Sequence, residues 1–169
     1  MKHLKNLMNI GWFWVLLLLA PMLYTACSSA GSAQSSTQTD AANLIQNRRF
    51  AFVPQTVNPM GGRTRQLTGE FFLRVTPDTV QSYLPYFGRA FSAPMTPGQG
   101  AMDFTVTNFE FSVTPGRNNR QTISIRPREG TDVRELILQV YPNGNASLQA
   151  LSNNRQPISY NGAVQSIRR

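Results

Sequence analysis

The segment that decides the fold is Val133–Ser152, with the sequence VRELILQVYPNGNASLQALS. Leu136, Leu138 and Val140 occupy alternate positions, so they lie on one face of an extended strand. The Asn-Gly dipeptide at 143–144 is a strong hairpin signal, and apolar residues return after it. The segment therefore predicts two antiparallel strands joined by a tight turn.

The same pattern of short apolar alternations separated by turn residues extends over the rest of the domain. No long segment has the 3.6-residue period of a helix, so the sequence predicts an all-β fold. We expect an antiparallel meander of about eight short strands, curled into a small barrel or folded as a sandwich. The apolar parity changes across Thr107-Asn108, which predicts a bulge or a tight bend. One short helical turn is expected near residues 78–84, with Asp78 as its cap.

The first 26 residues have the features of an export signal. Lys2 and Lys5 precede the apolar run Gly11–Leu23, and small residues stand at 25 and 26. A membrane-spanning helix needs about 20 apolar residues, and this run is shorter and interrupted by Pro21. We therefore expect a cleaved leader, with a retained signal-anchor as the alternative.

Cys27 is the only cysteine in the chain, and it follows the leader directly. Thr25, Ala26 and Cys27 resemble the bacterial lipobox, although Tyr24 stands where leucine is commonest. We predict that Cys27 is lipidated and attaches the protein to a membrane; a secreted protein with an idle thiol is the alternative. No aspartate directly follows Cys27, which by resemblance to lipoprotein sorting signals indicates an outer-membrane lipoprotein that faces the periplasm.

Three parts of the chain are distinguished by composition. Residues 1–26 are the lipoprotein signal peptide, and residues 27–43 are a lipid-anchored flexible linker rich in Ser, Ala, Gln and Thr. Residues 44–169 are long enough for one β domain with its own core.

Composition excludes most catalytic chemistries. Both lysines and the only histidine lie in the leader, so the mature chain has no Ser-His-Asp site, no Schiff-base lysine and no histidine metal site. A carboxylate pair could still act as acid and base, but most acidic residues lie in or beside turns. We expect no enzymatic activity, no cofactor and no metal.

The mature chain carries fourteen arginines against eight acidic residues. These arginines are scattered and form no stripe interleaved with aromatic residues, so we expect no nucleic-acid partner. Weak contact with anionic lipid headgroups at its own membrane is the more plausible use of the charge.

The least ordinary stretch is Tyr83–Phe91, with the sequence YLPYFGRAF. It predicts either a ligand pocket, with polar contacts from Tyr86 and Arg89, or an aromatic plug at one end of the β core. In the second case Arg89 would pair with Asp103 or Glu70. The candidate ligand-binding residues are Tyr83, Tyr86, Phe87, Arg89 and Phe91.

Four motifs carry a family resemblance: LPYFGRAF at 84–91, the Gly-Gly turn before Arg63, NGNASL at 143–148, and NNRQPISYNG at 153–162. They resemble a domain-of-unknown-function family of small lipoproteins and secreted proteins from Bacteroides-type bacteria. The resemblance covers residues 44–169 and implies an envelope location and lipidation of Cys27. It also implies that Asp78-Thr79-Val80 is an O-glycosylation signal, with Thr79 as the modified residue.

These observations favour a non-enzymatic β domain, tethered to the outer membrane, that binds an envelope protein, glycan or lipid or has a structural role. The alternative is a lipocalin-like carrier, because a barrel of about eight strands can hold one small apolar ligand.

Overall fold

The computed structural model describes residues 41–91 and 101–167, and the structural statements below concern these ranges. They belong to one compact unit, Gln34–Arg169. The leader, Cys27 and the linker through residue 40 lie outside the described residues.

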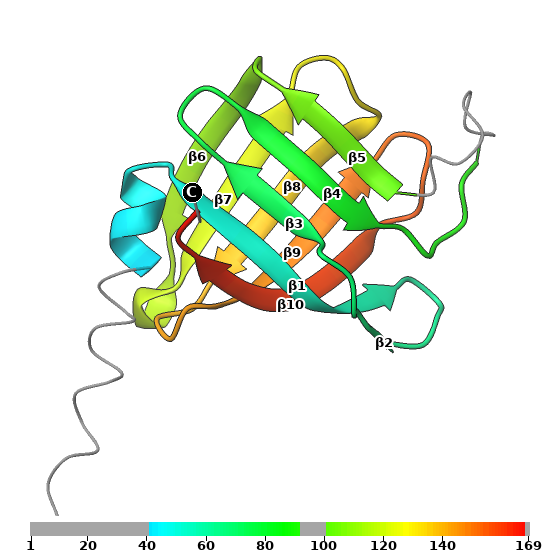
Figure 1. Ribbon diagram of the computed structural model, residues 1–169, viewed down its shortest axis with the longest axis horizontal. Coiled ribbons are helices and arrows are strands. Elements are labelled where there is room, and N and C mark those ends of the chain that lie inside the picture. The colour runs from blue at the N-terminus through cyan, green and yellow to red at the C-terminus, as the bar shows by residue number, and fades with distance from the viewer. Residues whose placement is uncertain (1–40, 92–100, 168–169) are drawn as a thin grey trace, which may run out of the picture. The chain divides into compact units, whose positions relative to one another are not determined.

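The described chain is almost entirely β-structure (Figure 1). A short helix over residues 41–46 precedes the strands, and a 3-10 turn, η2 (Arg117–Asn119), separates two of them. The strands are β1 (Phe50–Pro59), β2 (Arg65–Gln66), β3 (Phe72–Val75), β4 (Val80–Pro85), β5 (Ala101–Val106), β6 (Phe109–Pro115), β7 (Gln121–Pro127), β8 (Val133–Val140), β9 (Asn145–Ser152) and β10 (Ile158–Gln165).

All ten strands belong to one antiparallel sheet that curls into a nearly closed barrel (Figure 1). The strand order is β5-β4-β3-β1-β10-β9-β8-β7-β6, and β2 pairs with β1 beside this path. Consecutive strands pair from β3 to β5 and from β6 to β10, and β1 pairs with β3. The pairing of β1 with β10 joins these two runs and brings Ala51 opposite Gln165. The predicted antiparallel meander is confirmed, and it forms a barrel.

The two edges of the sheet, β5 and β6, are consecutive in the chain and are joined only by Thr107-Asn108. Every pairing along the nine-strand path is antiparallel, so its first and last members run in the same direction around the barrel. They are therefore two halves of one long bent strand, the first paired with β4 and the second with β7. Counted in this way, and without the two-residue β2, the barrel has the predicted eight strands.

Alternate residues of the strands point into the barrel and form its core. On β8, Leu136 and Leu138 are fully buried, as the alternation predicts, and the adjacent strand β9 contributes Leu148. The largest fully buried side chain is that of Tyr160 on β10, which belongs to the same hydrophobic cluster as Phe50 and Phe52. The core thus lies inside the ring of strands.

The closing pair, β1 and β10, approaches unusually closely at Gly162. A Cβ atom at this position would lie 2.0 Å from the carbonyl oxygen of Val53 and 2.8 Å from Cα of Pro54. The register of this pair shifts between Pro54 and Thr56, which marks a bulge at Gln55. Only glycine fits at position 162, because any Cβ atom would collide with the backbone of β1.

The predicted helical turn at 78–84 is wrong, because this segment is a turn followed by strand β4. The Thr79 amide donates to the Thr76 hydroxyl oxygen (3.0 Å), and the Thr76 amide donates to the Thr79 carbonyl (2.9 Å). Val80, Ser82 and Leu84 are then buried in alternation, which is the period of a strand. Hydrogen bonds between Thr76 and Thr79 therefore stabilise a turn at this position, where we expected a helix capped by Asp78.

The helix at 41–46 lies beside the start of β1. Ile45 is buried in the barrel core, and Leu44 packs against it. In residues 41–91 and 101–167 there is no helix of the length and apolar character needed to cross a bilayer.

Candidate functional site

The predicted ligand-binding stretch begins on β4 and continues past its end along the turn between β9 and β10. The Gln156 amide donates to the Arg89 carbonyl (3.1 Å), and the Phe91 amide donates to the Asn154 carbonyl (2.8 Å). Ala90 also forms an isolated antiparallel bridge with Arg155. These bonds hold residues 86–91 against the barrel as an ordered edge.

The Tyr86 side chain stabilises this edge through its hydroxyl. Its hydroxyl lies 2.9 Å from the Arg89 carbonyl oxygen and 3.1 Å from the Gln156 carbonyl oxygen, so its single proton is shared between these two acceptors. Its ring packs against the core, and burial raises the pKa of its hydroxyl above the ordinary value. Tyr86 is therefore a structural support, which matches the plug interpretation of the sequence.

Arg155 and Asp132 form a second support that the sequence analysis missed. The Arg155 guanidinium lies 3.1 Å from the Asp132 carboxylate and 5.2 Å from the Tyr86 ring centroid, and its side chain is 13% exposed. The Ser152 hydroxyl donates to the same carboxylate at 3.0 Å. The pairing joins two different turns, so no local pattern in the sequence indicates it.

Tyr160 lies in the barrel core and contacts the end of β4 where this stretch begins. Its side chain is fully buried, and its hydroxyl donates to the carbonyl of Pro85 at 2.8 Å. This bond connects β10 to the last residue of β4. Burial raises the pKa of Tyr160 well above the ordinary tyrosine value.

The remaining predicted side chains point outward at this end of the barrel. Phe91 is 72% exposed and Phe87 is 41% exposed, and Arg89 is also exposed. The Arg65 guanidinium of β2 lies 4.9 Å above the centroid of the Phe87 ring. We call Arg65, Phe87, Arg89 and Phe91 the rim. It offers flat apolar rings and arginines on a braced backbone.

Tyr83 lies apart from the rim, on the outer wall of the barrel. Its ring stacks on Phe71 with a centroid distance of 5.6 Å and lies 6.1 Å from the ring of Phe72. The predicted pairing of Arg89 with Asp103 or Glu70 is absent from the described ion pairs, which are Arg126–Glu135, Arg128–Glu110 and Arg155–Asp132.

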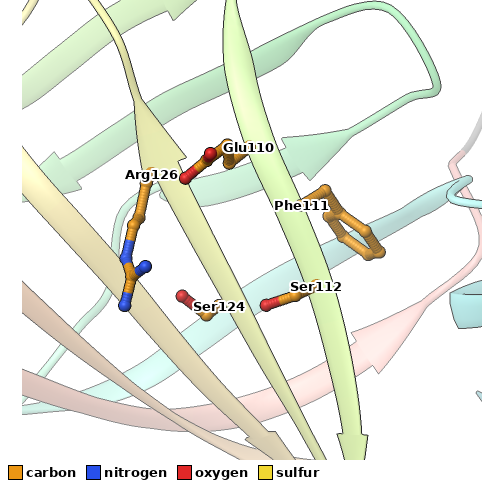
Figure 2. A pocket seen from close by; sticks show the side chains of 5 residues that line it. All are labelled: Glu110, Phe111, Ser112, Ser124 and Arg126. Atoms are coloured by element: carbon orange, nitrogen blue, oxygen red, sulfur yellow. The ribbon is translucent and has the colours of Figure 1, made fainter.

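A hollow of about 300 Å³ lies between β6 and β7 (Figure 2). The opposed pairs Glu110–Arg126 and Ser112–Ser124 share one face of these strands. In Figure 2 their side chains lie on one side of the ribbon, while the ring of Phe111 lies on the other side. The lining residues are Glu110, Phe111, Ser112, Ser124 and Arg126.

Each of the two carboxylates near this hollow, those of Glu110 and Glu135, forms an ion pair with an arginine. Glu135 on β8 accepts from the Ser124 hydroxyl (2.6 Å) and from Arg126 Nε (3.1 Å), and these contacts keep the pKa of Glu135 low. Glu110 pairs with Arg128. A general acid needs the opposite shift, because it must keep its proton near neutral pH.

Thr79, the candidate glycosylation site, lies in the turn between β3 and β4. Its side chain is half-buried, and its amide is engaged by Thr76. Among the residues described, no cluster of three or more His, Cys, Asp or Glu side chains is arranged to hold a metal ion.

Residues 32–164 match the family described as "Domain of unknown function (DUF4251)". The protein belongs to the DUF4251 family. The family resemblance drawn from LPYFGRAF and the other motifs is thereby confirmed. The match covers the whole described barrel except the end of β10.

A crystal structure of a DUF4251 family protein from Bacteroides eggerthii is similar to this chain. The TM-score is 0.57 with 16% sequence identity, over 78% of this chain and 89% of the other. At this identity the similarity shows a shared fold. No curated protein matches the chain.

Proposed function

We propose that this DUF4251 protein is an outer-membrane lipoprotein, anchored through Cys27, whose barrel is a non-enzymatic binding domain in the periplasm. The single cysteine directly after the leader supports the anchor. The exposed rim supports binding: Phe87 and Phe91 are exposed, and backbone hydrogen bonds of Arg89 and Phe91 to the β9–β10 turn hold this segment in place. Aromatic residues, phenylalanine among them, and arginine are enriched at protein interfaces.

The chemistry of the barrel favours binding over catalysis. Its carboxylates at 110, 132 and 135 are each paired with an arginine. For Glu135 the contacts with Ser124 and Arg126 lower the pKa, which opposes a role in proton donation. The mature chain has no histidine or lysine to replace them.

The anchor is tested by metabolic labelling with an alkyne fatty acid in the native host. We expect label on the wild-type protein, none on a Cys27→Ser variant, and an intact mass that corresponds to acylated Cys27 after loss of residues 1–26. An unlabelled wild-type protein in the culture medium would contradict the proposal.

Binding at the rim is tested with a photo-crosslinking amino acid at position 91, compared with the same residue at Val113. Val113 is also an exposed apolar residue, but it lies on β6 near the turn to β7. We expect a discrete adduct from position 91 only. Equal adducts from both positions, or none from position 91, would refute the rim as the contact surface.

The carrier alternative rests on the eight-strand meander, which can enclose a ligand. Phe50, Phe52 and Tyr160 already occupy the core as fully buried side chains, so a ligand would share the interior with them. Native mass spectrometry of protein purified without refolding separates the two: a bound small molecule supports the carrier, and the bare mass of the lipoprotein refutes it.

A further inference from the structure

One end of the barrel collects the turns that surround the start of β1. It consists of residues 41–49, 76–79, 115–120, 141–145 and 165–167, which we call the tether end. The pairing register connects these segments: Phe50 faces Val75, Ala51 faces Gln165, Ala163 faces Asn145, and Gln121 faces Val140. The helix and the β6–β7 turn lie on the same side of Figure 1.

The tether end is strongly basic over these described segments. It carries Arg48, Arg49, Arg117 and Arg120 against a single acidic residue, Asp78 in the turn between β3 and β4. Arg48, Arg49 and Arg117 are exposed, and the Arg48 guanidinium lies 4.8 Å above the ring centroid of Phe111. Tyr141 adds an exposed aromatic ring. Positive charge therefore exceeds negative charge at this end, with four arginines against one aspartate.

The rim lies at the opposite end. Strands β1, β9 and β10 each run between the two ends, over eight to ten residues, which is about 25 Å for eight residues of extended chain. The rim end also carries three exposed arginines, Arg63, Arg65 and Arg89, which provide a matched comparison.

We propose that the tether end docks on the anionic phospholipid headgroups of the membrane that holds the anchor. This inference rests on the proposed lipidation of Cys27. Thirteen residues separate Cys27 from residue 41, where the described chain begins at the tether end. A random coil of thirteen residues has a root-mean-square span of about 20 Å, and a connection of that length would keep this end close to the bilayer.

Charge complementarity selects the lipid chemistry. A basic residue close to an anionic bilayer contributes about 1 kcal/mol, equivalent to about a fivefold change in the binding constant. Arginine also pairs with phosphate oxygens through two parallel hydrogen bonds. Docking in this orientation points the rim away from the bilayer, toward the compartment in which a partner would be met.

The orientation is measured on the lipidated protein reconstituted into vesicles that contain a headgroup-nitroxide lipid. A fluorophore is attached to an introduced cysteine, Gln165→Cys at the tether end or Met60→Cys at the other end. Both positions are exposed, and Met60 is 65% exposed. Acylation of Cys27 leaves the introduced thiol as the only reactive one.

We expect quenching at position 165 in vesicles with 30% phosphatidylglycerol, and much less in pure phosphatidylcholine or in 1 M salt. Replacing Arg48, Arg49 and Arg117 with glutamine should weaken docking by up to about a hundredfold, at about fivefold per arginine. The matched variant with Arg63, Arg65 and Arg89 replaced by glutamine changes the net charge equally and should retain the quenching. Each triple variant removes one arginine stacked on a phenylalanine.

Quenching at position 60 instead of 165, equal quenching at both positions, or equal loss in the two triple variants would overturn the docking proposal. Failure of the lipoprotein assignment is read separately, because the mass of the purified protein reports acylation of Cys27. If Cys27 is unmodified, the same chain and its two triple variants are sedimented with the same vesicles. Selective loss of binding in the Arg48/Arg49/Arg117 variant still supports docking, and equal binding of both variants refutes it.

Discussion

Replacing Tyr160 with phenylalanine removes one buried hydroxyl that connects β10 to the end of β4. The hydroxyl donates to the Pro85 carbonyl at 2.8 Å, and the Tyr160 side chain is fully buried. The variant loses this hydrogen bond and leaves a buried carbonyl without the donor, which costs about 2 kcal/mol of the free energy of unfolding. For a domain of this size, that corresponds to a fall in Tm of about 8 °C.

The pH dependence distinguishes this mechanism from a simple packing defect. Burial raises the pKa of Tyr160 in the folded state, while an unfolded tyrosine has a pKa of about 10. Because the folded pKa is the higher one, the stabilising contribution is complete below pH 10 and is lost as the pH rises through 10 toward the folded pKa. At pH 11 the wild-type protein loses about 1.4 kcal/mol that phenylalanine cannot lose.

The assay is urea unfolding at pH 7, 9, 10 and 11, followed by far-ultraviolet circular dichroism. The difference between the wild type and the variant should be about 2 kcal/mol at pH 7 and below 1 kcal/mol at pH 11. Tyr141→Phe is the control, because Tyr141 is 40% exposed, and it should change stability by less than about 0.5 kcal/mol. A Tyr160→Phe effect below about 0.5 kcal/mol at pH 7, or one that stays constant up to pH 11, would refute this reasoning.

Three further changes test other parts of the barrel. Gly162→Ala places a Cβ against the Val53 carbonyl and should destabilise the fold by at least about 2 kcal/mol in thermal unfolding; Gly69→Ala, where the added atom meets only the movable Phe71 ring, is the milder control, and equal effects would contradict the close approach. Asp132→Asn weakens the contact with the largely buried Arg155 and should cost about 1–2 kcal/mol, whereas Glu110→Gln at an exposed pair should cost less than about 1 kcal/mol; the reverse order in urea midpoints would be inconsistent with the anchoring role of Arg155. Glu135→Gln should flatten the acid limb of the stability curve, because the lowered pKa of Glu135 means that its stabilising contribution is present above the unfolded pKa and is lost as the pH falls through the folded value; an unchanged curve between pH 2 and 5 would argue against the Ser124 and Arg126 contacts.

The strands were predictable where local alternation and turn chemistry agree. Leu136, Leu138 and Val140 are buried as the sequence predicts, and the Asn-Gly dipeptide at 143–144 does form a hairpin, with Gly144 at φ 82°. The parity change at Thr107-Asn108 correctly indicated a bend. These features depend on residues that are close in the chain.

The errors and omissions depend on partners that are distant in the chain. At Asp78 the sequence resembles a helix cap, but pairing of β4 with both β3 and β5 selects the strand. Arg155 and Asp132 meet only because the β7–β8 and β9–β10 turns fall at the same end. The hollow beside Ser112 and Ser124 likewise needs the register of two strands.

Among the predicted ligand-binding residues, local sequence indicated an unusual edge but not the different roles within it. The structure separates Tyr86, which supports the backbone, from Phe87 and Phe91, which are exposed. Burial of an aromatic residue depends on which neighbouring turn covers it. That information is absent from the nine-residue stretch itself.

The pairing of β1 with β10 has a consequence for how the protein is made. All the other pairs along the ring join strands that are near one another in the chain, whereas this pair joins residues 51 and 165. The ring therefore cannot close until nearly the whole polypeptide has emerged, and loop-closure entropy makes such distant contacts slow to form. For the exported lipoprotein that we propose, this means that the chain lacks its final tertiary structure while it crosses the inner membrane, and that β10 completes the fold on the far side.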